Sequence, residues 1–329
     1  MDSLINHPGI IALFSVVVLI MLLLDLGIFN KNSHVVSNKE ALIWSVVWIS
    51  LSMGFSGVIY YFMGVEKFSQ FQSAYWIEKA LSVDNLFVFI MVFGFFNVPK
   101  ENHHRVLFWG IIGALLLRAV FIFSGVELIK LTYLPVMTIF GREMEINVVL
   151  TLFGFFLVYA GIKSAFTEDD DDEEKDFSTS PGARVIHRFF KVSKNYDKDH
   201  FFTIENGIKM ATPMLVVVGV IEFTDLLFAV DSIPAIFAIA PDDPFILYTS
   251  NIFAILGLRS LYFLLANFIH LFSKLKYGLA IILAFIGVKM VISPVYHIDS
   301  MHSLMVVGGV LVLSVLASVI FPEKKKEQA

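Results

Sequence analysis

The stretch Glu222-Phe-Thr-Asp225-Leu-Leu-Phe-Ala-Val-Asp231-Ser-Ile-Pro234 places three carboxylates inside a run that is otherwise apolar. No charged residue occurs at positions 210–221 or 232–241. A carboxylate in the centre of a membrane helix costs about 2.5–3.5 kcal/mol on insertion scales, so acids that persist there usually serve a function. The stretch therefore predicts a membrane helix that carries a functional site.

A second stretch, Glu78-Lys-Ala-Leu-Ser-Val-Asp84-Asn, repeats the pattern. Val-Asp-Asn matches Val-Asp-Ser, and in both stretches another acid lies six residues before the Asp. Glu78 and Asp84 thus correspond to Asp225 and Asp231. Two further pairs of similar segments follow in the same order in both halves of the chain: Leu117-Arg118 with Leu258-Arg259, and Gly161-Ile-Lys163 with Gly287-Val-Lys289.

The composition indicates a protein that crosses the membrane several times. The 329 residues have a mean hydropathy of +0.78, and 57% of them are hydrophobic. Both values are well above those of an ordinary soluble domain. The net charge of −5 gives no basic surface of the kind a nucleic-acid-binding protein needs. The chain has no cysteine, which excludes disulfides, thiolate metal sites and thiol redox chemistry.

The expected fold is an all-α polytopic membrane protein with about nine transmembrane helices and two inverted three-helix repeats. The expected spans are about 9–29, 41–63, 74–96, 106–129, 145–166, 211–236, 245–271, 275–293 and 303–322. The segment 130–145, which contains Pro135 and Gly141, is expected not to span, with a re-entrant turn as the alternative.

These spans predict five segments of chain. They are two N-terminal helices in 1–73, a first repeat in 74–166, an acidic-then-basic cytoplasmic loop in 167–210, a second repeat in 211–293, and a final helix with a basic tail in 294–329. Each repeat has an odd number of spans, so the second copy enters the membrane from the opposite face. The acidic run at 168–174 predicts a solvated tether or, alternatively, a weak collector of divalent cations.

Lys and Arg residues are unevenly divided between the connections. The loops after spans 1, 3, 5 and 7, together with the C-terminus, contain 16, and the opposite side contains 3. Cytoplasmic loops carry the excess of basic residues. We therefore expect the N-terminus outside and the C-terminus in the cytoplasm.

The intramembrane acids predict a cation site between the two repeats. On a helix, Glu78 shares a face with Ser82 and Asn85, while Asp84 lies 120° away. Pro234 lacks an N–H group, which predicts a broken helix with a free carbonyl beside the acids. Oxygen ligands without sulfur favour Mg, Ca or Mn over zinc or copper. The predicted metal ligands are Glu78, Asp84, Asn85, Asp225, Asp231 and Ser232, with Glu222 and Asp25 as further candidates. Glu222 is alternatively a proton site.

Arg118 and Arg259 are expected to balance these charges, since an unpaired charge in a low dielectric is very unfavourable. They could also pair with the acids once a cation has left. Lys163 and Lys289 lie near span ends, so we expect them to extend toward the membrane surface. Asp25 either reaches the interface or joins the site.

The two acidic stretches, together with Thr249-Ser-Asn251-x5-Gly257-Leu-Arg259 and Lys276-Tyr-Gly-Leu-Ala280, resemble the TerC family, in particular its Alx branch. The resemblance covers nearly the whole chain. It implies a bacterial inner-membrane protein grouped with the LysE-type exporters and linked to tellurium resistance, alkaline response, redox modulation and manganese export.

The function expected first is a secondary transporter that exports divalent metal, with Mn2+ as substrate, and that holds no permanently bound cofactor. One alternative is a stress or redox-modulating membrane scaffold, and another is a LysE-type amino-acid exporter. No nucleophile–base pairing or His-Glu metal motif points to an enzyme. The expected partners are the metal ion and the lipid bilayer; no nucleic acid is expected, and the sequence identifies no protein partner.

Overall fold

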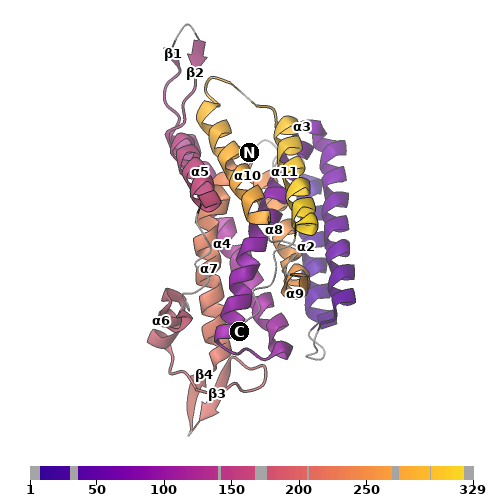
Figure 1. Ribbon diagram of the computed structural model, residues 1–329, viewed down its shortest axis with the longest axis vertical. Coiled ribbons are helices and arrows are strands. Elements are labelled where there is room, and N and C mark those ends of the chain that lie inside the picture. Colours follow the sequence, from indigo (N-terminus) through magenta and orange to yellow (C-terminus); the bar gives the residue numbers. More distant parts are fainter. Residues whose placement is uncertain are drawn as a thin grey trace.

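The protein is mostly helical, and its helices run along one long bundle with a small β-hairpin at each end (Figure 1). A computed structural model describes residues 8–29, 36–139, 142–166, 176–205, 207–268, 274–296 and 298–321. The helices of the bundle are α2 (Pro8–Phe29), α3 (Asn38–Phe95), α4 (His103–Leu131), α5 (Val148–Phe166), α7 (Pro213–Phe237), α8 (Pro244–Leu256), α9 (Leu258–Phe268), α10 (Leu275–Ile292) and α11 (Ser300–Ile320).

Short elements occupy the two ends of the bundle. At one end, β1 (Met137–Ile139) pairs antiparallel with β2 (Arg142–Met144), so the segment expected not to span forms a hairpin. At the other end lie α6 (Pro181–Phe189) and the antiparallel pair β3 (Phe202–Glu205) and β4 (Ile208–Ala211) (Figure 1). The 3₁₀ turns η1 (Lys100–Asn102) and η2 (Phe177–Thr179) complete the elements. The acidic run at 168–174 lies outside the described residues.

Local sequence signals account for several helix boundaries. Ser37 caps α3 by accepting a hydrogen bond from the Glu40 amide, and Asp243 caps α8 through the Ile246 amide. Proline occupies the first turn of both α7 and α8, where its missing N–H group costs nothing. Gly64 has φ +85° inside α3, a conformation that favours glycine, and it divides α3 into two helices that meet at a kink.

The structure supports fewer membrane spans than the nine expected. Within the described residues, five helices are long and apolar enough to cross a membrane: Asn38–Ser82, Lys100–Leu131, Val148–Ala165, Leu275–Ile292 and Ser300–Ile320. A sixth arises if Pro244–Leu256 and Leu258–Ala266, which are bent by 41°, form one span. The expected spans 41–63 and 74–96 both lie in α3, on either side of Gly64. The protein is thus a multi-pass membrane protein, whereas nine spans and inverted repeats are not confirmed.

The expected helix break at Pro234 is wrong, because α7 continues through it to Phe237. The fixed φ of proline suits a helix, and membrane helices tolerate the lost hydrogen bond when neighbouring helices cover the site. A break instead separates α8 from α9 at Gly257.

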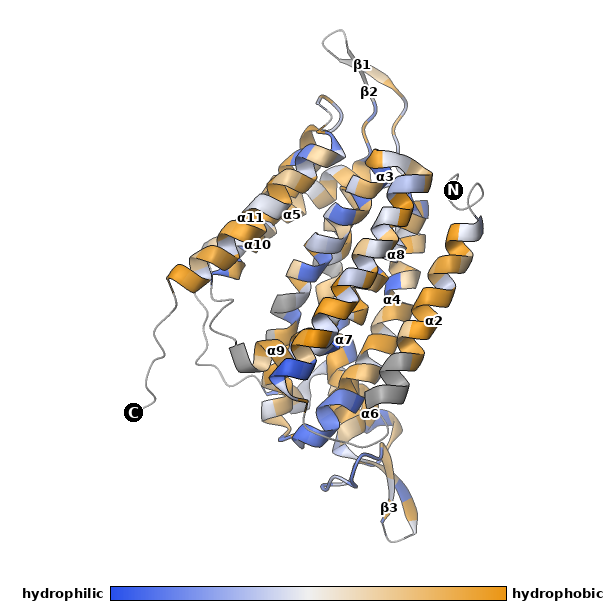
Figure 2. Ribbon diagram, turned by 90° about the vertical axis from the view of Figure 1, so that its right-hand side faces the viewer, coloured by the Kyte–Doolittle hydropathy of each residue, from blue (hydrophilic) through white to orange (hydrophobic). Residues whose placement is uncertain are grey.

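The core and the outer surface follow the pattern of a membrane bundle. Large apolar side chains are exposed along α2 and α11, among them Leu23, Leu313 and Ile320. Figure 2 shows hydrophobic residues along both helices and hydrophilic residues gathered at the end that carries α6. Inside, α3 packs against α7, α8 and α9, and α4 packs against α7 and α8. This packing brings the polar faces of α3, α4 and α7 together.

A candidate cation site at the junction of three helices

Glu78 of α3, Arg118 of α4 and Asp225 of α7 meet in the interior of the bundle. The Arg118 Nη1 atom lies 2.5 Å from Glu78 Oε1, and its Nη2 atom lies 3.6 Å from Asp225 Oδ1. All three side chains are buried, with at most 5% of each residue exposed. The structure therefore brings together two of the predicted ligands and one of the two arginines expected to balance them.

Hydroxyl groups extend this cluster. Ser82, one helical turn after Glu78, donates a hydrogen bond to Glu78 Oε1 at 3.2 Å. Arg118 Nη1 donates to Ser232 Oγ at 3.4 Å, which places α7 in contact with α4 a second time. Asn85 is also buried, one turn beyond Ser82 on the predicted polar face of α3.

Several polar atoms of the cluster have no hydrogen-bond partner among the described residues. They are Glu78 Oε2, Asp225 Oδ2, Arg118 Nε and Arg118 Nη2. The 3.6 Å approach of Arg118 to Asp225 is close enough for electrostatic attraction but too long for a hydrogen bond. Buried polar groups of this kind are costly unless satisfied. The single guanidinium of Arg118 therefore satisfies only part of the hydrogen-bonding capacity of the two carboxylates.

Glu222 lies one helical turn before Asp225, and its position depends on a glycine in the facing helix. A Cβ atom at Gly113 of α4 would lie 2.0 Å from Glu222 Oε1 and 2.1 Å from Oε2. The carboxylate of Glu222 thus rests directly on the backbone of α4. A side chain at position 113 would displace it.

Arg259 is buried near the same cluster. Together with Asp225 it lines a cavity of about 20 Å³, whose other walls include Gly110 and Ala114 of α4. The two arginines expected to balance the acids therefore both lie near Asp225, from different helices.

Three predicted ligands cannot be placed. The backbones of Asp25, Asp84 and Asp231 lie in α2, α3 and α7, but their side chains are outside the part of the chain that the structure describes. Among the described side chains, no group of three or more His, Cys, Asp and Glu residues lies close enough together to hold a metal ion. The ligand set therefore stays a prediction.

One lysine differs from expectation. Lys289, expected to extend toward the membrane surface, is only 6% exposed and donates a hydrogen bond to Ser303 Oγ at 2.8 Å. Its burial follows from the packing of α10 against α11.

Lys79 was not among the predicted site residues. Its Nζ atom donates to the Ala254 carbonyl at 3.2 Å, beside the break between α8 and α9. A Cβ atom at Gly257 would lie 2.6 Å from that nitrogen. A lysine next to Glu78 in an apolar run was the signal that could have revealed it.

Comparison with known proteins agrees with this architecture. The profile described as "Integral membrane protein TerC family" matches residues 63–326. The chain is 43% identical to "Uncharacterized membrane protein STKORF319" of Myxococcus xanthus over 316 residues, which are 96% of this chain and 93% of that protein. It is 41% identical to "Putative membrane-bound redox modulator Alx" of Escherichia coli (strain K12) over 310 residues, 92% of this chain and 91% of that one.

A further relative with the same name, from Photorhabdus laumondii, is 40% identical over 324 residues and 96% of both chains. No solved structure matches the chain. The family profile covers well over half of the sequence, and the relatives align along nearly their whole lengths. The chain therefore belongs to the TerC family of integral membrane proteins.

Proposed function

We propose that this protein is a secondary transporter of the bacterial inner membrane that exports divalent metal cations, with Mn2+ as its cargo. The observation that carries the proposal is the sharing of Arg118 between Glu78 and Asp225 in the interior of a membrane bundle. With Glu222 and Arg259 included, three carboxylates and two guanidinium groups leave a formal excess of one negative charge. A dication could take the place of the guanidinium and would suit hard oxygen ligands.

Arg118 gives this exchange a physical basis. Because Glu78 already holds the guanidinium at 2.5 Å, a cation that enters must compete with a tethered positive charge. When the cation leaves, the arginine can return and keep the carboxylates paired. The weaker contact, to Asp225 at 3.6 Å, identifies Asp225 as the carboxylate that is more readily given up.

Contacts between α5 and α10 support an inverted repeat. If Gly161 corresponds to Gly287, the same offset relates Gly154 to Ala280. A Cβ atom at Gly287 would lie 2.6 Å from the Gly154 carbonyl, and one at Gly161 would lie 2.7 Å from the Ala280 carbonyl. The proposed equivalence converts the first of these contacts into the second and the second into the first. A two-fold relation between the repeats requires this behaviour. The pairings of α3 with α7 and of α4 with α8 also join helices in equivalent places.

The proposed orientation has the N-terminus outside and the C-terminus in the cytoplasm. The connection that contains α6 and the connection that contains the β1–β2 hairpin lie at opposite ends of the bundle (Figure 1). One expected span, α5, separates these two connections, so their positions support the proposed topology. Reporter fusions at Asn195 and Val295 should report opposite faces of the membrane. Activity of the same reporter at both positions would rule out this arrangement.

The name of the Alx relatives suggests redox modulation as an alternative. This chain contains no cysteine, so thiol–disulfide exchange would have to be carried out by a partner protein. An amino-acid exporter would need a positive pole for the substrate carboxylate, and Arg259 could supply one. The excess of the three carboxylates Glu78, Asp225 and Glu222 over the two arginines favours a cationic substrate.

Flux of Mn2+ in proteoliposomes tests the proposal. Wild-type protein should move Mn2+ across the vesicle membrane, and Asp225→Asn should abolish flux while the protein remains folded. Asp225 suits this test because its contact with Arg118 is the longer one, so its loss disturbs folding less than that of Glu78. Glu127→Gln, which changes an exposed carboxylate of α4, is the matched control. Wild-type flux in folded Asp225→Asn protein would refute the assigned site.

A further inference from the structure

Helix α6 packs against the first turns of α7, at the side of the bundle (Figure 1). A Cβ atom at Gly182 of α6 would lie 2.2 Å from the Gly219 carbonyl oxygen, and one at Gly219 would lie 2.9 Å from Ile186. Gly219 lies six residues after the first residue of α7, which is roughly 9 Å along a helix. Helix α6 therefore lies alongside the uncharged residues 213–221 and not beyond the end of the bundle.

The sides of α6 differ in their chemistry. Ile186 packs on α7, and the exposed side chains of Val185 and Phe189 lie within about 100° of it around the helix. The exposed side chains of Arg184 and Arg188 both lie about 160° from Ile186. The helix thus has an apolar flank next to its contact with α7 and a basic side that faces away from α7.

Aromatic rings connect α6 with α4 through the base of the β3–β4 hairpin. The Phe190 ring, at the end of α6, lies 5.4 Å from the Phe202 ring, and Lys209 Nζ lies 4.7 Å from the centre of that second ring. The neighbouring Phe201 ring lies 6.1 Å from the indole of Trp109 in α4, which is exposed. Tryptophan is enriched where a membrane protein meets the lipid headgroups, so an exposed tryptophan here fits that level of the membrane.

We propose that α6 lies in the headgroup region of the membrane and binds anionic phospholipids through Arg184 and Arg188, with Val185 and Phe189 against the acyl chains. Residues 181–194 contain four basic side chains and no acidic one, a charge opposite to that of an anionic headgroup. Helices with a basic and an apolar side bind membrane surfaces by burying the apolar side chains and attracting anionic lipids. This binding does not depend on transport.

Two other occupants fit this surface less well. The acidic run at 168–174 consists of seven carboxylates, which could pair with the arginines but would leave Val185 and Phe189 exposed to water. A second copy of the chain, related by a two-fold axis, would bring the arginines of both copies together, where like charges repel. A phospholipid matches both the basic and the apolar side.

Fluorescence quenching in lipid nanodiscs tests this proposal on the full-length protein. Because the chain has no cysteine, the substitution Val185→Cys allows one fluorophore to be attached beside the arginines. The nanodiscs consist of phosphatidylcholine with a small fixed fraction of quencher lipid, which is either phosphatidylglycerol or phosphatidylcholine with the same nitroxide near the top of an acyl chain. Phosphatidylglycerol should quench this label about twofold more strongly, or better, since each basic side chain near the surface attracts anionic lipid.

Two further labels serve as controls. Leu313→Cys places the fluorophore on an exposed apolar position of α11, where both quencher lipids should act equally. His187→Cys places it about 200° around α6 from position 185, where quenching by either lipid should be weaker. Quenching at position 187 as strong as at position 185 would contradict the proposed orientation of α6.

Removal of the charges decides whether the arginines bind the lipid. In the Val185→Cys protein, Arg184→Gln/Arg188→Gln should bring quenching by the two lipids close to equality, because the apolar flank remains and the charge is lost. A preference for phosphatidylglycerol that survives this change, or one that is absent from the parent protein, would overturn the inference. Protection of the label from both lipids would also overturn it, since another part of the protein or a second copy would then cover the surface. Deletion of residues 168–174 should leave the preference unchanged, whereas a preference that appears only after the deletion would assign the arginines to the acidic run.

Discussion

Replacement of Arg118 by glutamine should destabilise the protein far more than an equivalent change at its surface. At an effective dielectric constant of about 20, unit charges at the observed separations of 2.5 Å and 3.6 Å attract each other by about 7 and about 5 kcal/mol. Desolvation of the three groups offsets much of this attraction. Removing one partner of a buried pair nevertheless costs about 3–5 kcal/mol, since it leaves buried charge uncompensated.

A double-variant cycle isolates the contact from the other effects of substitution. Glu78→Gln removes the partner at 2.5 Å and should cost more than Asp225→Asn, which removes the partner at 3.6 Å. The double variant Arg118→Gln/Glu78→Gln leaves no isolated charge from this pair. Its loss of stability should therefore fall at least about 2 kcal/mol short of the sum of the single losses.

Unfolding titrations in mixed micelles measure these free energies. Arg105→Gln is the matched control, because Arg105 also pairs with an aspartate, Asp199, but both side chains are 29% or more exposed. Such surface pairs contribute about 0–1 kcal/mol. If Arg118→Gln costs no more than Arg105→Gln, or if the double-variant losses simply add, the buried pair does not stabilise the fold as reasoned.

Two glycine substitutions test the close contacts around the site. Gly113→Ala would put a methyl group 2.0 Å from Glu222, so it should cost about 1–3 kcal/mol through overpacking and reduce Mn2+ flux; unchanged stability and flux would contradict this. Gly257→Ala meets the flexible end of Lys79 at 2.6 Å and the Cβ atom of Trp48 at 3.3 Å, and should cost about 1 kcal/mol or more through the lost hydrogen bond to α8, as read from unfolding titrations. Gly57→Ala, with nothing within 4 Å of the added carbon, is the control for both and should not destabilise.

The part of the site that the sequence predicted follows from one rule. A charge within an apolar run must find a partner, so Glu78, Asp225 and Arg118 could be expected to meet before their helices were placed. The rule gives the partners but not the distances. That Arg118 lies 1.1 Å nearer to Glu78 than to Asp225 depends on how α3 and α4 each pack against α7.

Features that depend on tertiary packing could not be predicted from the sequence. Both Pro234 and Gly257 are plausible places for a helix to break, but α7 passes through Pro234 and the chain bends at Gly257. Neighbouring helices decide between such positions, since they can replace one lost hydrogen bond. The burial of Lys289 depends in the same way on Ser303 from the next helix.

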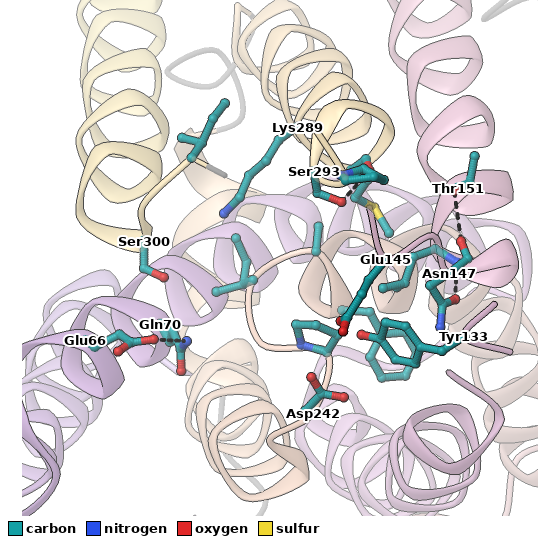
Figure 3. Close-up of a pocket in the computed structure, with 18 residues that line it drawn as sticks. Glu66, Gln70, Tyr133, Glu145, Asn147, Thr151, Asp242, Lys289, Ser293 and Ser300 are labelled. Carbon is teal, nitrogen blue, oxygen red and sulfur yellow. Dashed lines mark hydrogen bonds between the residues drawn. The ribbon is translucent and has the colours of Figure 1, made fainter. Parts of the chain in front are cut away.

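A cavity of about 500 Å³ at the end of the bundle that carries the β1–β2 hairpin (Figure 3) gave no sequence signal, because its polar residues come from helices and loops far apart in the chain. Glu66, Glu145 and Asp242 each look like ordinary solvated acids when the sequence is read alone. Only the fold shows that several connections converge on one space. Motif analysis therefore finds groups of residues within one helix more readily than groups that come from several connections.

The interior cluster sets the cost of binding a cation there. Glu78 and Asp225 are nearly free of solvent, and Arg118 already lies 2.5 Å from Glu78. An ion that binds between these carboxylates must therefore shed water and displace a guanidinium.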